Sequence, residues 1–441
     1  MSHTEELTTR LSAGTEFVIV VPYETKRCSA TLKIVSVGGG VDPRVDVLGA
    51  PVVVDVSYNL IPGMEFSIFA WTNATVRIEG SKQLLLNCYR PTTPPFVRPL
   101  VEYHCIIHDA RVLADKKALF GPLVLICGTN DAEKHVIGRT LCSYAARTGW
   151  SPQLVDLDCG VGQMLGPPGT VCAGVIEYPM TLDEDTTIGP TSVSFFTGST
   201  APQVKSSSGE WNMYAPYVHY SHLMMSCASN RIARHTGRVS GSSGAVIILP
   251  DLKGVSGLLF VEDLLRRFNI SHILCIGDDF LFCGLHNRIS NMQESAGSRT
   301  VASTRIDKLS KSFIYSPLDS GSERIASRLE RYFFGGGAID LQPSEINKRY
   351  SSIEILALKD TNGQAVVSNV EQDALEGIVG CVGALFESST KRDRDILSLS
   401  PFAFARVQGV DAQGVSILVS THSAIPETLV MIIGSYCWVT S

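Results

Sequence analysis

Residues 128–135 have the types and spacing of a phosphate-binding loop. They are Gly128-Thr129-Asn130-Asp131-Ala132-Glu133-Lys134-His135, with an apolar run at 123–127 before them and a helical pattern after them. In the pattern G-x-x-x-x-G-K-[ST], backbone amides and the lysine hold the phosphates of a nucleotide, and the hydroxyl group ligates magnesium. Gly128 and Lys134 match this pattern in spacing and in context, so the chemistry that the segment suggests is nucleotide binding.

Two residues of this loop depart from the pattern. Glu133 stands at the second glycine, where its carboxylate would meet phosphate oxygens, and His135 stands at the hydroxyl residue. Two like unit charges about 4 Å apart repel by about 4 kcal/mol at an effective dielectric constant near 20, which weakens binding by about a thousandfold. An imidazole is also a poor replacement for an oxygen ligand of magnesium. Alternatively, Gly128 only begins a strand-to-helix turn and Lys134 is a solvated helix residue.

The elements around the loop alternate between strands and helices. Apolar runs that predict strands lie at 123–127, 153–157, 193–196, 245–249 and 272–276, and helical stretches lie at 212–234, 256–268 and 279–291. Such alternation predicts a parallel sheet covered by helices on both faces. A ligand of such a sheet binds beyond the carboxyl ends of the strands.

The two ends of the chain have a different pattern. Short runs of β-branched and aromatic residues predict strands at 15–21, 30–37, 52–56, 66–71 and 74–79, and again at 352–357, 378–386, 404–407, 415–419 and 429–438. Four prolines at 90–99 predict a linker, and three glycines at 335–337 predict a hinge. The expected domains are an N-terminal β domain at 1–100, a kinase-like α/β domain at 101–335 and a C-terminal β domain at 336–441.

The composition limits the class of protein. A hydrophobic content of 44 % with 18 % charged residues is typical of a folded protein. The net charge of −6 argues against a generally basic nucleic-acid-binding surface, so contact with RNA would be local or indirect. Twelve cysteines without a C-x-x-C pair favour a reducing compartment. We expect neither a signal peptide nor a membrane span, because the start of the chain has no apolar signal region and no run of 18 apolar residues occurs.

Beyond this loop, further segments match one known family, in the same order along most of the chain. They are Val45-Asp46-Val47-Leu48-Gly49, Ile68-Phe69-Ala70-Trp71, Val155-Asp156-Leu157-Asp158, Pro168-Gly169-Thr170, Phe195 to Pro202, Arg328 to Gly335, Gly377 to Gly380 and Ile417 to Pro426. In these segments the sequence resembles the Clp-type polynucleotide 5′-hydroxyl kinases, which are subunits of pre-mRNA cleavage factors.

The resemblance implies that the front and central domains hold ATP between them. A front-domain glutamate and apolar groups clasp the adenine in this family, which makes Glu16 and Phe66 candidates, with Asp46 a weaker one. Asp158 matches the aspartate that helps with magnesium and with activation of the substrate hydroxyl. The implied nucleotide-binding set is Glu16, Phe66, Gly128, Asp131, Ala132, Glu133, Lys134 and His135, with Lys134 and Asp158 in catalytic roles. Otherwise the front-domain residues are ordinary strand residues and Asp158 caps a turn.

Two further departures from the family pattern point to loss of the reaction. The family segment whose tryptophan stacks on the terminal RNA base falls near 249–254, where no aromatic residue stands, so a stacking contribution of about 1–3 kcal/mol is absent. The arginine-rich lid is shortened, although Arg324, Arg328 and Arg331 are retained. These arginines would neutralise the moving phosphate or merely solvate a helix face.

Three hypotheses about function follow. The first is a scaffold subunit of the mRNA 3′-end cleavage and polyadenylation machinery whose RNA kinase activity is lost. The second is an active ATP-dependent polynucleotide 5′-hydroxyl kinase in mRNA 3′-end processing or tRNA splicing. The third is an unrelated protein with a similar loop. ATP and magnesium are the expected cofactors if the site is competent, and otherwise none is expected.

The remaining predictions concern metals, partners and location. His219, His222 and Cys227 lack the spacing of a closed zinc site, so no protein-held metal is expected. The resemblance implies other pre-mRNA cleavage factor subunits as partners, RNA as a local or indirect partner, and a nuclear location.

Overall fold

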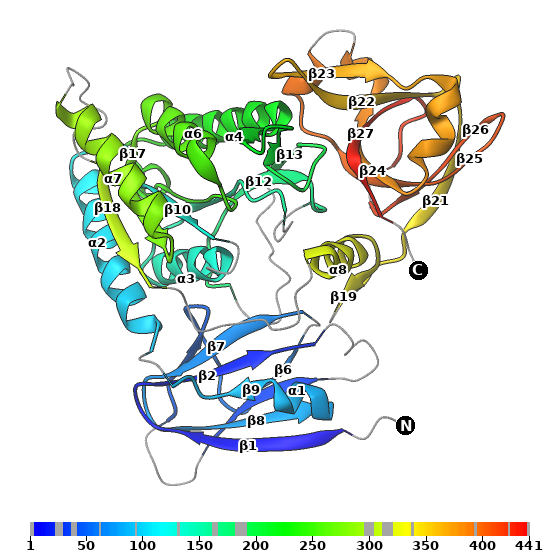
Figure 1. The fold of residues 1–441 in the computed structure, drawn as a ribbon. Coiled ribbons are helices and arrows are strands. Elements are labelled where there is room, and N and C mark those ends of the chain that lie inside the picture. The colour runs from blue at the N-terminus through cyan, green and yellow to red at the C-terminus, as the bar shows by residue number, and fades with distance from the viewer. Residues whose placement is uncertain are drawn as a thin grey trace.

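The computed structural model describes residues 4–22, 30–36, 42–60, 63–92, 95–129, 133–160, 166–180, 192–294, 304–310, 321–336, 339–391, 395–421 and 424–438. Figure 1 shows a β domain at the N-terminal end, a central α/β domain and a β domain at the C-terminal end. Among the described residues, no helix is long and apolar enough to cross a membrane.

The N-terminal domain is a β-sandwich. One sheet has the order β1 (Glu5–Leu11), β8 (Ala74–Gly80), β3 (Thr31–Val35) and β6 (Ser57–Asn59); the other has β5 (Ala50–Pro51), β4 (Val45–Val47), β7 (Glu65–Ala70), β2 (Thr15–Val20) and β9 (Cys88–Tyr89). A short helix, α1 (Lys82–Leu86), precedes β9. Alternate residues of the strands, such as Ile19, Leu32 and Ile78, form the core between the sheets. The predicted strand at 52–56 is wrong, since β5 ends at Pro51 and the next strand, β6, begins at Ser57, and β1 was not predicted.

The central sheet has the order β13 (Val193–Phe196), β12 (Thr170–Val175), β11 (Gln153–Asp156), β16 (Ala245–Ile248), β10 (Leu123–Gly128), β17 (Ile270–Ile276) and β18 (Arg305–Leu309). The strands from β11 to β18 in this order pair in parallel, as predicted. At one edge, β12 and β13 are joined to this parallel part in antiparallel fashion. The loop-bearing strand β10 lies in the interior of the sheet.

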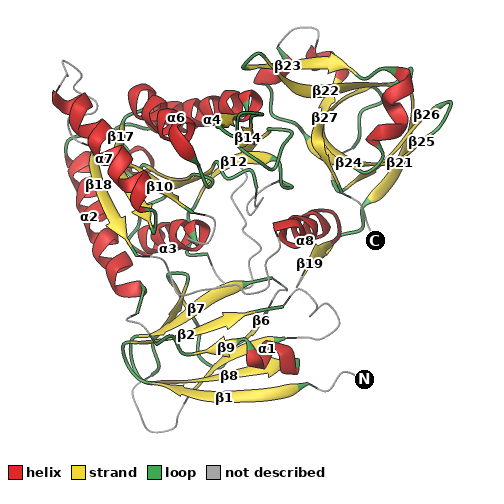
Figure 2. Ribbon diagram, viewed as in Figure 1, coloured by secondary structure: helices red, strands yellow, loops and turns green. Residues whose placement is uncertain are grey.

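Helices cover both faces of this sheet (Figure 2). One face carries α2 (Val97–Lys116) and α3 (Lys134–Arg147), and the other carries α4 (Ala215–Arg234), α6 (Gly254–Arg267) and α7 (Asp279–Glu294). Along β10, Val124 and Ile126 pack toward α2 and α3, whereas Leu123 and Leu125 pack toward the other three helices. This alternation follows from the two-residue period of a strand that is buried on both faces. Short elements complete the domain: the hairpin β14 (Gln203–Lys205) and β15 (Trp211–Met213), and α5 (Val239–Ser242).

The last described helix before the C-terminal domain is α8 (Gly321–Phe334), and it leads into a two-stranded ribbon of β19 (Gly335–Gly336) and β20 (Ile339–Asp340). The C-terminal sheet then has the order β21 (Ser344–Arg349), β26 (Gly414–Val419), β25 (Ala403–Val410), β24 (Cys381–Glu387), β27 (Leu429–Cys437), β22 (Ile353–Thr361) and β23 (Gln364–Asn369). Only the described pair β22–β27 is parallel in this sheet. Short helical turns are α9 (Ser388–Lys391), η3 (Gln372–Ile378) and η4 (Ile396–Ser398).

Specific contacts join the domains. Arg147 at the end of α3 forms an ion pair of 2.6 Å with the buried Asp46 of β4 and donates to the carbonyl of Gly49. On the other side, the carboxylate of Asp360 in β22 accepts from the backbone N–H of Ala215 at the start of α4, at 2.8 Å. These contacts fix both β domains against the helices of the central domain.

Candidate nucleotide site

The predicted phosphate-binding segment lies where the sequence placed it, between β10 and α3, at the carboxyl edge of the sheet. Glu133 is the residue before α3, and it has φ 48° and ψ 39°, the left-handed conformation. That conformation costs an L-residue about 1–2 kcal/mol and is normally left to glycine. The backbone therefore retains the shape that a second glycine would give it, although a glutamate occupies the position. Asp131 and Ala132, two of the predicted residues, lie outside the described residues.

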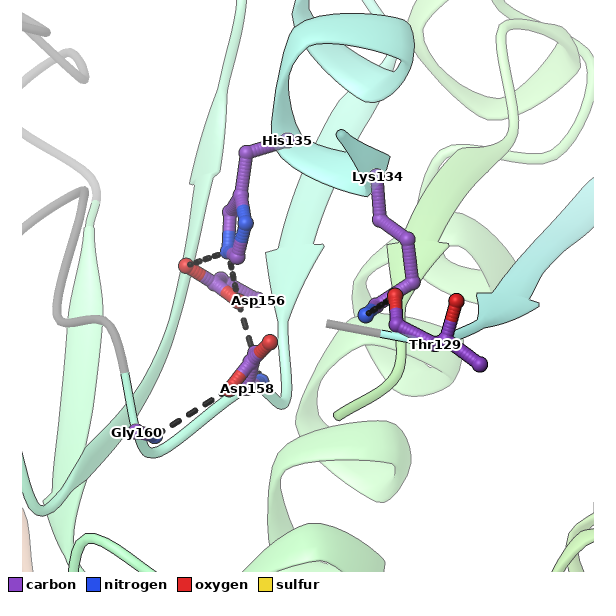
Figure 3. Close-up of polar contacts among 6 residues, drawn as sticks. All are labelled: Thr129, Lys134, His135, Asp156, Asp158 and Gly160. Carbon is purple, nitrogen blue, oxygen red and sulfur yellow. Dashed lines mark hydrogen bonds and ion pairs between the residues drawn. The ribbon is translucent and has the colours of Figure 1, made fainter. Parts of the chain in front are cut away.

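Lys134 is turned back onto the loop. Its side chain is buried, and its Nζ donates to the carbonyl oxygen of Thr129 at 2.9 Å. Figure 3 shows the lysine pointing to Thr129 and away from the imidazole of His135. A lysine of a phosphate-binding loop reaches the β- and γ-phosphates, so this one would have to give up its carbonyl contact before it could do so.

His135 stands at the loop position whose hydroxyl group ligates magnesium in the phosphate-binding pattern. Its Nε2 lies 3.1 Å from both carboxylate oxygens of Asp156, the last residue of β11, and both side chains are buried. In phosphate-binding loops the hydroxyl residue at this position and an aspartate at a strand end hold the magnesium ion. Here an imidazole stands at the hydroxyl position, and it contacts the carboxylate of Asp156, whose Oδ1 also accepts from the backbone N–H of Asp158, the residue that the family resemblance links to magnesium.

Asp158 completes the polar row that begins at His135. Its backbone N–H donates to Asp156 Oδ1 at 3.0 Å, and its own Oδ1 accepts from the N–H of Gly160 at 3.1 Å (Figure 3). Burial raises the pKa of Asp158 above 3.8, while the charges of Lys134 and His135 act to lower it. Through its contact with Gly160, Asp158 caps this turn, which is the role predicted from the sequence as the alternative to catalysis. Catalysis by Asp158 stays a prediction.

The described part of this site does not fit magnesium-bound ATP. Glu133 stands where the loop pattern has its second glycine, Lys134 donates to the carbonyl of Thr129, and His135 contacts Asp156. No group of three or more histidine, cysteine, aspartate or glutamate side chains is arranged to hold a metal in the described ranges. Lys134 and His135 thus contact protein groups in this structure.

Two front-domain candidates have structural roles instead. Both carboxylate oxygens of the buried Glu16 accept backbone N–H groups, from Phe96 and Val97, at 3.0 Å each. Glu16 thus caps the first turn of α2, where a negative charge is favoured. Phe66 is 0 % exposed in the core of the β-sandwich, so it offers no surface to an adenine. The weaker candidate Asp46 pairs with Arg147, as described above.

Two of the three arginines retained from the predicted lid, Arg328 and Arg331 of α8, lie close enough to α3 for their charges to act on Arg139. The pKa of Arg139 on α3 is lowered to about 10, first by burial and then by the charges of Arg328 and Arg331 on α8. Burial also lowers the pKa of Arg331 to about 10. Arg328 and Arg331 of α8 therefore lie near α3, the helix that follows the loop. The spacing of these residues in the sequence does not predict that proximity.

Sequence reasoning missed one aromatic residue. Trp211 of β15 lies beside the segment before α6, with the Nζ atoms of Lys253 and Lys205 at 5.8 and 6.0 Å from its ring centroid. The statement that no aromatic stands at 249–254 is correct for those residues, but the β14–β15 hairpin brings a tryptophan to the same place. No local signal predicts this contact, because Trp211 is about 40 residues away in the sequence.

Comparison with known proteins identifies the family. The family model "mRNA cleavage and polyadenylation factor CLP1 P-loop" matches residues 128–335, and the model "N-terminal beta-sandwich domain of polyadenylation factor" matches residues 10–114. The chain belongs to the Clp1 family. The family resemblance predicted from the sequence is confirmed.

Relatives extend this similarity over most of the chain. An mRNA cleavage and polyadenylation factor clp1 of Botryotinia fuckeliana is 23 % identical over 86 % of this chain and 84 % of its own length. A CLP1 homolog of Arabidopsis thaliana is 22 % identical over 91 % and 89 %. A polyribonucleotide 5′-hydroxyl-kinase Clp1 of Xenopus laevis is 30 % identical, over 54 % of this chain and 50 % of its own length.

Solved structures share the whole three-domain fold. Wild-type Clp1p in complex with a Pcf11p fragment superposes with a TM-score of 0.75 at 17 % identity, over 99 % of each chain. A second Clp1p structure, of a point mutant studied for its loss of ATP and its extended interface with Pcf11p, has a TM-score of 0.77 at 16 % identity and covers 98 % of this chain and 99 % of that one. The predicted fold class, a central α/β domain between two β domains, is confirmed.

Proposed function

We propose that this Clp1-family chain is a subunit of the mRNA 3′-end cleavage and polyadenylation machinery, that it acts mainly as a scaffold, and that it no longer transfers phosphate. The observation that carries the second part is the contact of His135 with both carboxylate oxygens of Asp156, at 3.1 Å. It ties the imidazole at the hydroxyl position of the loop pattern to a carboxylate next to Asp158, the residue that the family resemblance links to magnesium.

The other contacts of the loop support the same conclusion. The site would have to release Lys134 from the Thr129 carbonyl and move the Glu133 carboxylate before triphosphate oxygens could enter. Each lost hydrogen bond of this kind costs about 0.5–1.5 kcal/mol, and more where a charged group is involved. The free energy of nucleotide binding must supply that reorganisation energy and also overcome the charge repulsion. We therefore expect the contacts of Lys134 and His135 and the charge of Glu133 each to lower the affinity for nucleotide.

The scaffold role rests on the intact fold. Both β domains and the central sheet match the solved Clp1p chains over nearly their full length, and those chains were solved with Pcf11p. A surface that meets a cleavage-factor subunit does not need a working phosphate site. We therefore propose a Pcf11-like cleavage-factor subunit as the partner and the nucleus as the location.

The test has two arms that use the purified full-length chain. In the first, RNA with a 5′-hydroxyl end is incubated with magnesium-ATP, and the expected result is no 5′-phosphate above that of a Lys134→Ala variant. Phosphorylation that is abolished by Lys134→Ala refutes the loss of activity. In the second, the chain is mixed with a Pcf11-like subunit, and co-elution that is unchanged by Lys134→Ala supports a scaffold. Failure of the two to associate removes that role.

The alternative is an active ATP-dependent polynucleotide 5′-hydroxyl kinase, in mRNA 3′-end processing or tRNA splicing. Lys134 and Asp158 favour it, because both are present at the carboxyl edge of the sheet and the pKa of Asp158 is raised by burial. In this case magnesium-ATP would displace the contacts described above. Calorimetry distinguishes the two: heat of binding at micromolar ATP supports the alternative, and heat without RNA product indicates ATP that is bound only for structure.

A further inference from the structure

Two cysteines of the C-terminal domain face each other across neighbouring strands. Cys381 begins β24 and Cys437 ends β27, and they stand directly opposite in the antiparallel register. Their sulfur atoms lie 2.7 Å apart. A disulfide bond is about 2.05 Å long, so a small movement of the two side chains brings the sulfur atoms to bonding distance, and residues that face each other in an antiparallel pair have their Cβ atoms near the separation that a disulfide needs.

The strand end that carries Cys437 also contacts the central domain, as β22 does. Cys381 pairs with Cys437, and Gly383 pairs with Ile433. Between these two pairs β24 has one residue, Val382, whereas β27 has three, residues 434–436. Those three residues bulge toward the central domain. The backbone N–H of Ser435 donates to the carbonyl of Gly198 at 2.7 Å.

The bulge reaches the turn that carries Asp158. The hydroxyl of Tyr436 donates to the carbonyl of Pro168, and the ring packs on Gly169, where an added Cβ would lie 2.7 Å from it. The N–H of Gly169 donates in turn to the carbonyl of Cys159 at 2.7 Å, next to Asp158 in the chain. A short series of contacts thus runs from the cysteine pair to the candidate nucleotide site.

We propose that Cys381 and Cys437 are an oxidation site that forms an intrachain disulfide and so fastens the 434–436 bulge against the central domain. This inference does not depend on the proposed scaffold function. One end of the bulge is held by the Ile433–Gly383 pairing, and the disulfide holds the other. It also fixes the next residue, Trp438, whose ring stacks on Phe333 of α8 with centroids 5.7 Å apart.

The chemistry requires a disulfide oxidant such as oxidised glutathione. Cys437 is exposed, whereas Cys381 is buried and its pKa is raised to about 12, chiefly by burial. The Cys437 thiolate attacks the oxidant, whose S–S bond breaks, and a mixed disulfide forms with loss of one glutathione thiolate. Cys381 then loses its proton and attacks the Cys437 sulfur, and the second glutathione leaves. Two electrons pass from the two thiols to the oxidant, and the two protons reach the two glutathione thiolates.

Peptide mapping of the full-length chain tests the proposal. The reduced chain is incubated with oxidised glutathione, the remaining thiols are alkylated, and the expected result is a peptide that links Cys381 to Cys437, with loss of two hydrogen masses and of two alkylation sites. Cys437→Ser must remove the linked peptide. Cys283→Ser, a change at an exposed cysteine of α7, must leave it in place. A chain that carries only a glutathione adduct on Cys437, or links in which other cysteines dominate, overturns the proposal.

Hydrogen exchange then tests the structural consequence. Backbone amides of 434–438 are expected to exchange more slowly in the oxidised chain than in the reduced chain, and the Cys437→Ser variant should show no difference between the two conditions. Equal exchange in the oxidised and reduced parent chain, with the linked peptide present, refutes the claim that the bond fastens the bulge.

Discussion

Replacement of Glu133 separates two effects that we expect of this residue, backbone strain at the start of α3 and charge repulsion of a bound nucleotide. The left-handed backbone at φ 48° costs an L-residue about 1–2 kcal/mol. Glycine removes this strain, but it loses about 0.5–1 kcal/mol more in chain entropy on folding. Glu133→Gly should therefore stabilise the start of α3 by about 1 kcal/mol or less. Removal of the charge should strengthen ATP binding, by up to about 4 kcal/mol if a phosphate oxygen lies about 4 Å away. Glu133→Gln removes the charge and keeps the strain.

The assay has to report on the loop rather than on the whole chain, because three domains need not unfold in one step. Hydrogen exchange at the first turn of α3 measures the local stability, and calorimetry with magnesium-ATP measures the affinity. We expect slower exchange for Glu133→Gly only, and tighter ATP binding for both variants. Asn362→Gly is a matched control, since Asn362 is also left-handed, at φ 55°, but lies in the turn between β22 and β23.

Two outcomes would refute this reasoning. If the parent chain already binds magnesium-ATP as tightly as Glu133→Gln does, the carboxylate does not oppose the phosphates. If Glu133→Gly speeds exchange at the start of α3, the glutamate side chain stabilises the loop by more than its backbone strain costs.

The remaining predictions concern the domain contact, the buried acid and the tryptophan. Arg147→Ala should weaken the contact between the front and central domains by about 1–3 kcal/mol, because it leaves the buried Asp46 carboxylate without its 2.6 Å partner; limited proteolysis should then release the front domain faster, and equal rates would contradict this. The pKa of Asp158 is raised above 3.8, so its favourable contribution to folding is complete below pH 3.8 and is lost as the pH rises through the raised value. Asp158→Asn should accordingly have a higher unfolding midpoint than the parent at pH 7, and the two midpoints should converge near pH 3.8. Trp211→Ala should lower the affinity for single-stranded RNA by about 1–3 kcal/mol per stacked base, as fluorescence anisotropy would measure, whereas an unchanged affinity would show that the ring serves packing alone.

Local patterns predicted much of the fold. The buried runs at 123–127, 245–249 and 272–276 became neighbouring parallel strands because a strand that is buried on both faces must be apolar throughout. The edge strand β1 was missed for the opposite reason. Its sequence, EELTTRL, is mostly polar, and it pairs with β8 through backbone groups that leave little trace in the side chains. The strand β12 was not predicted either, and the sequence does not indicate its antiparallel direction, because a short apolar run has the same composition in either direction.

By itself, the sequence determined the family and the three-part architecture, and it predicted a degenerate phosphate-binding loop, since these depend on residue type and order. Tertiary structure alone decided where the side chains of that site turned. Lys134 bonded to Thr129, His135 to Asp156 and Glu16 to the start of α2, and a distant tryptophan came to lie beside Lys253. The physical reason is that a buried polar group must find a partner, and which partner is near depends on how segments far apart in the chain are packed together.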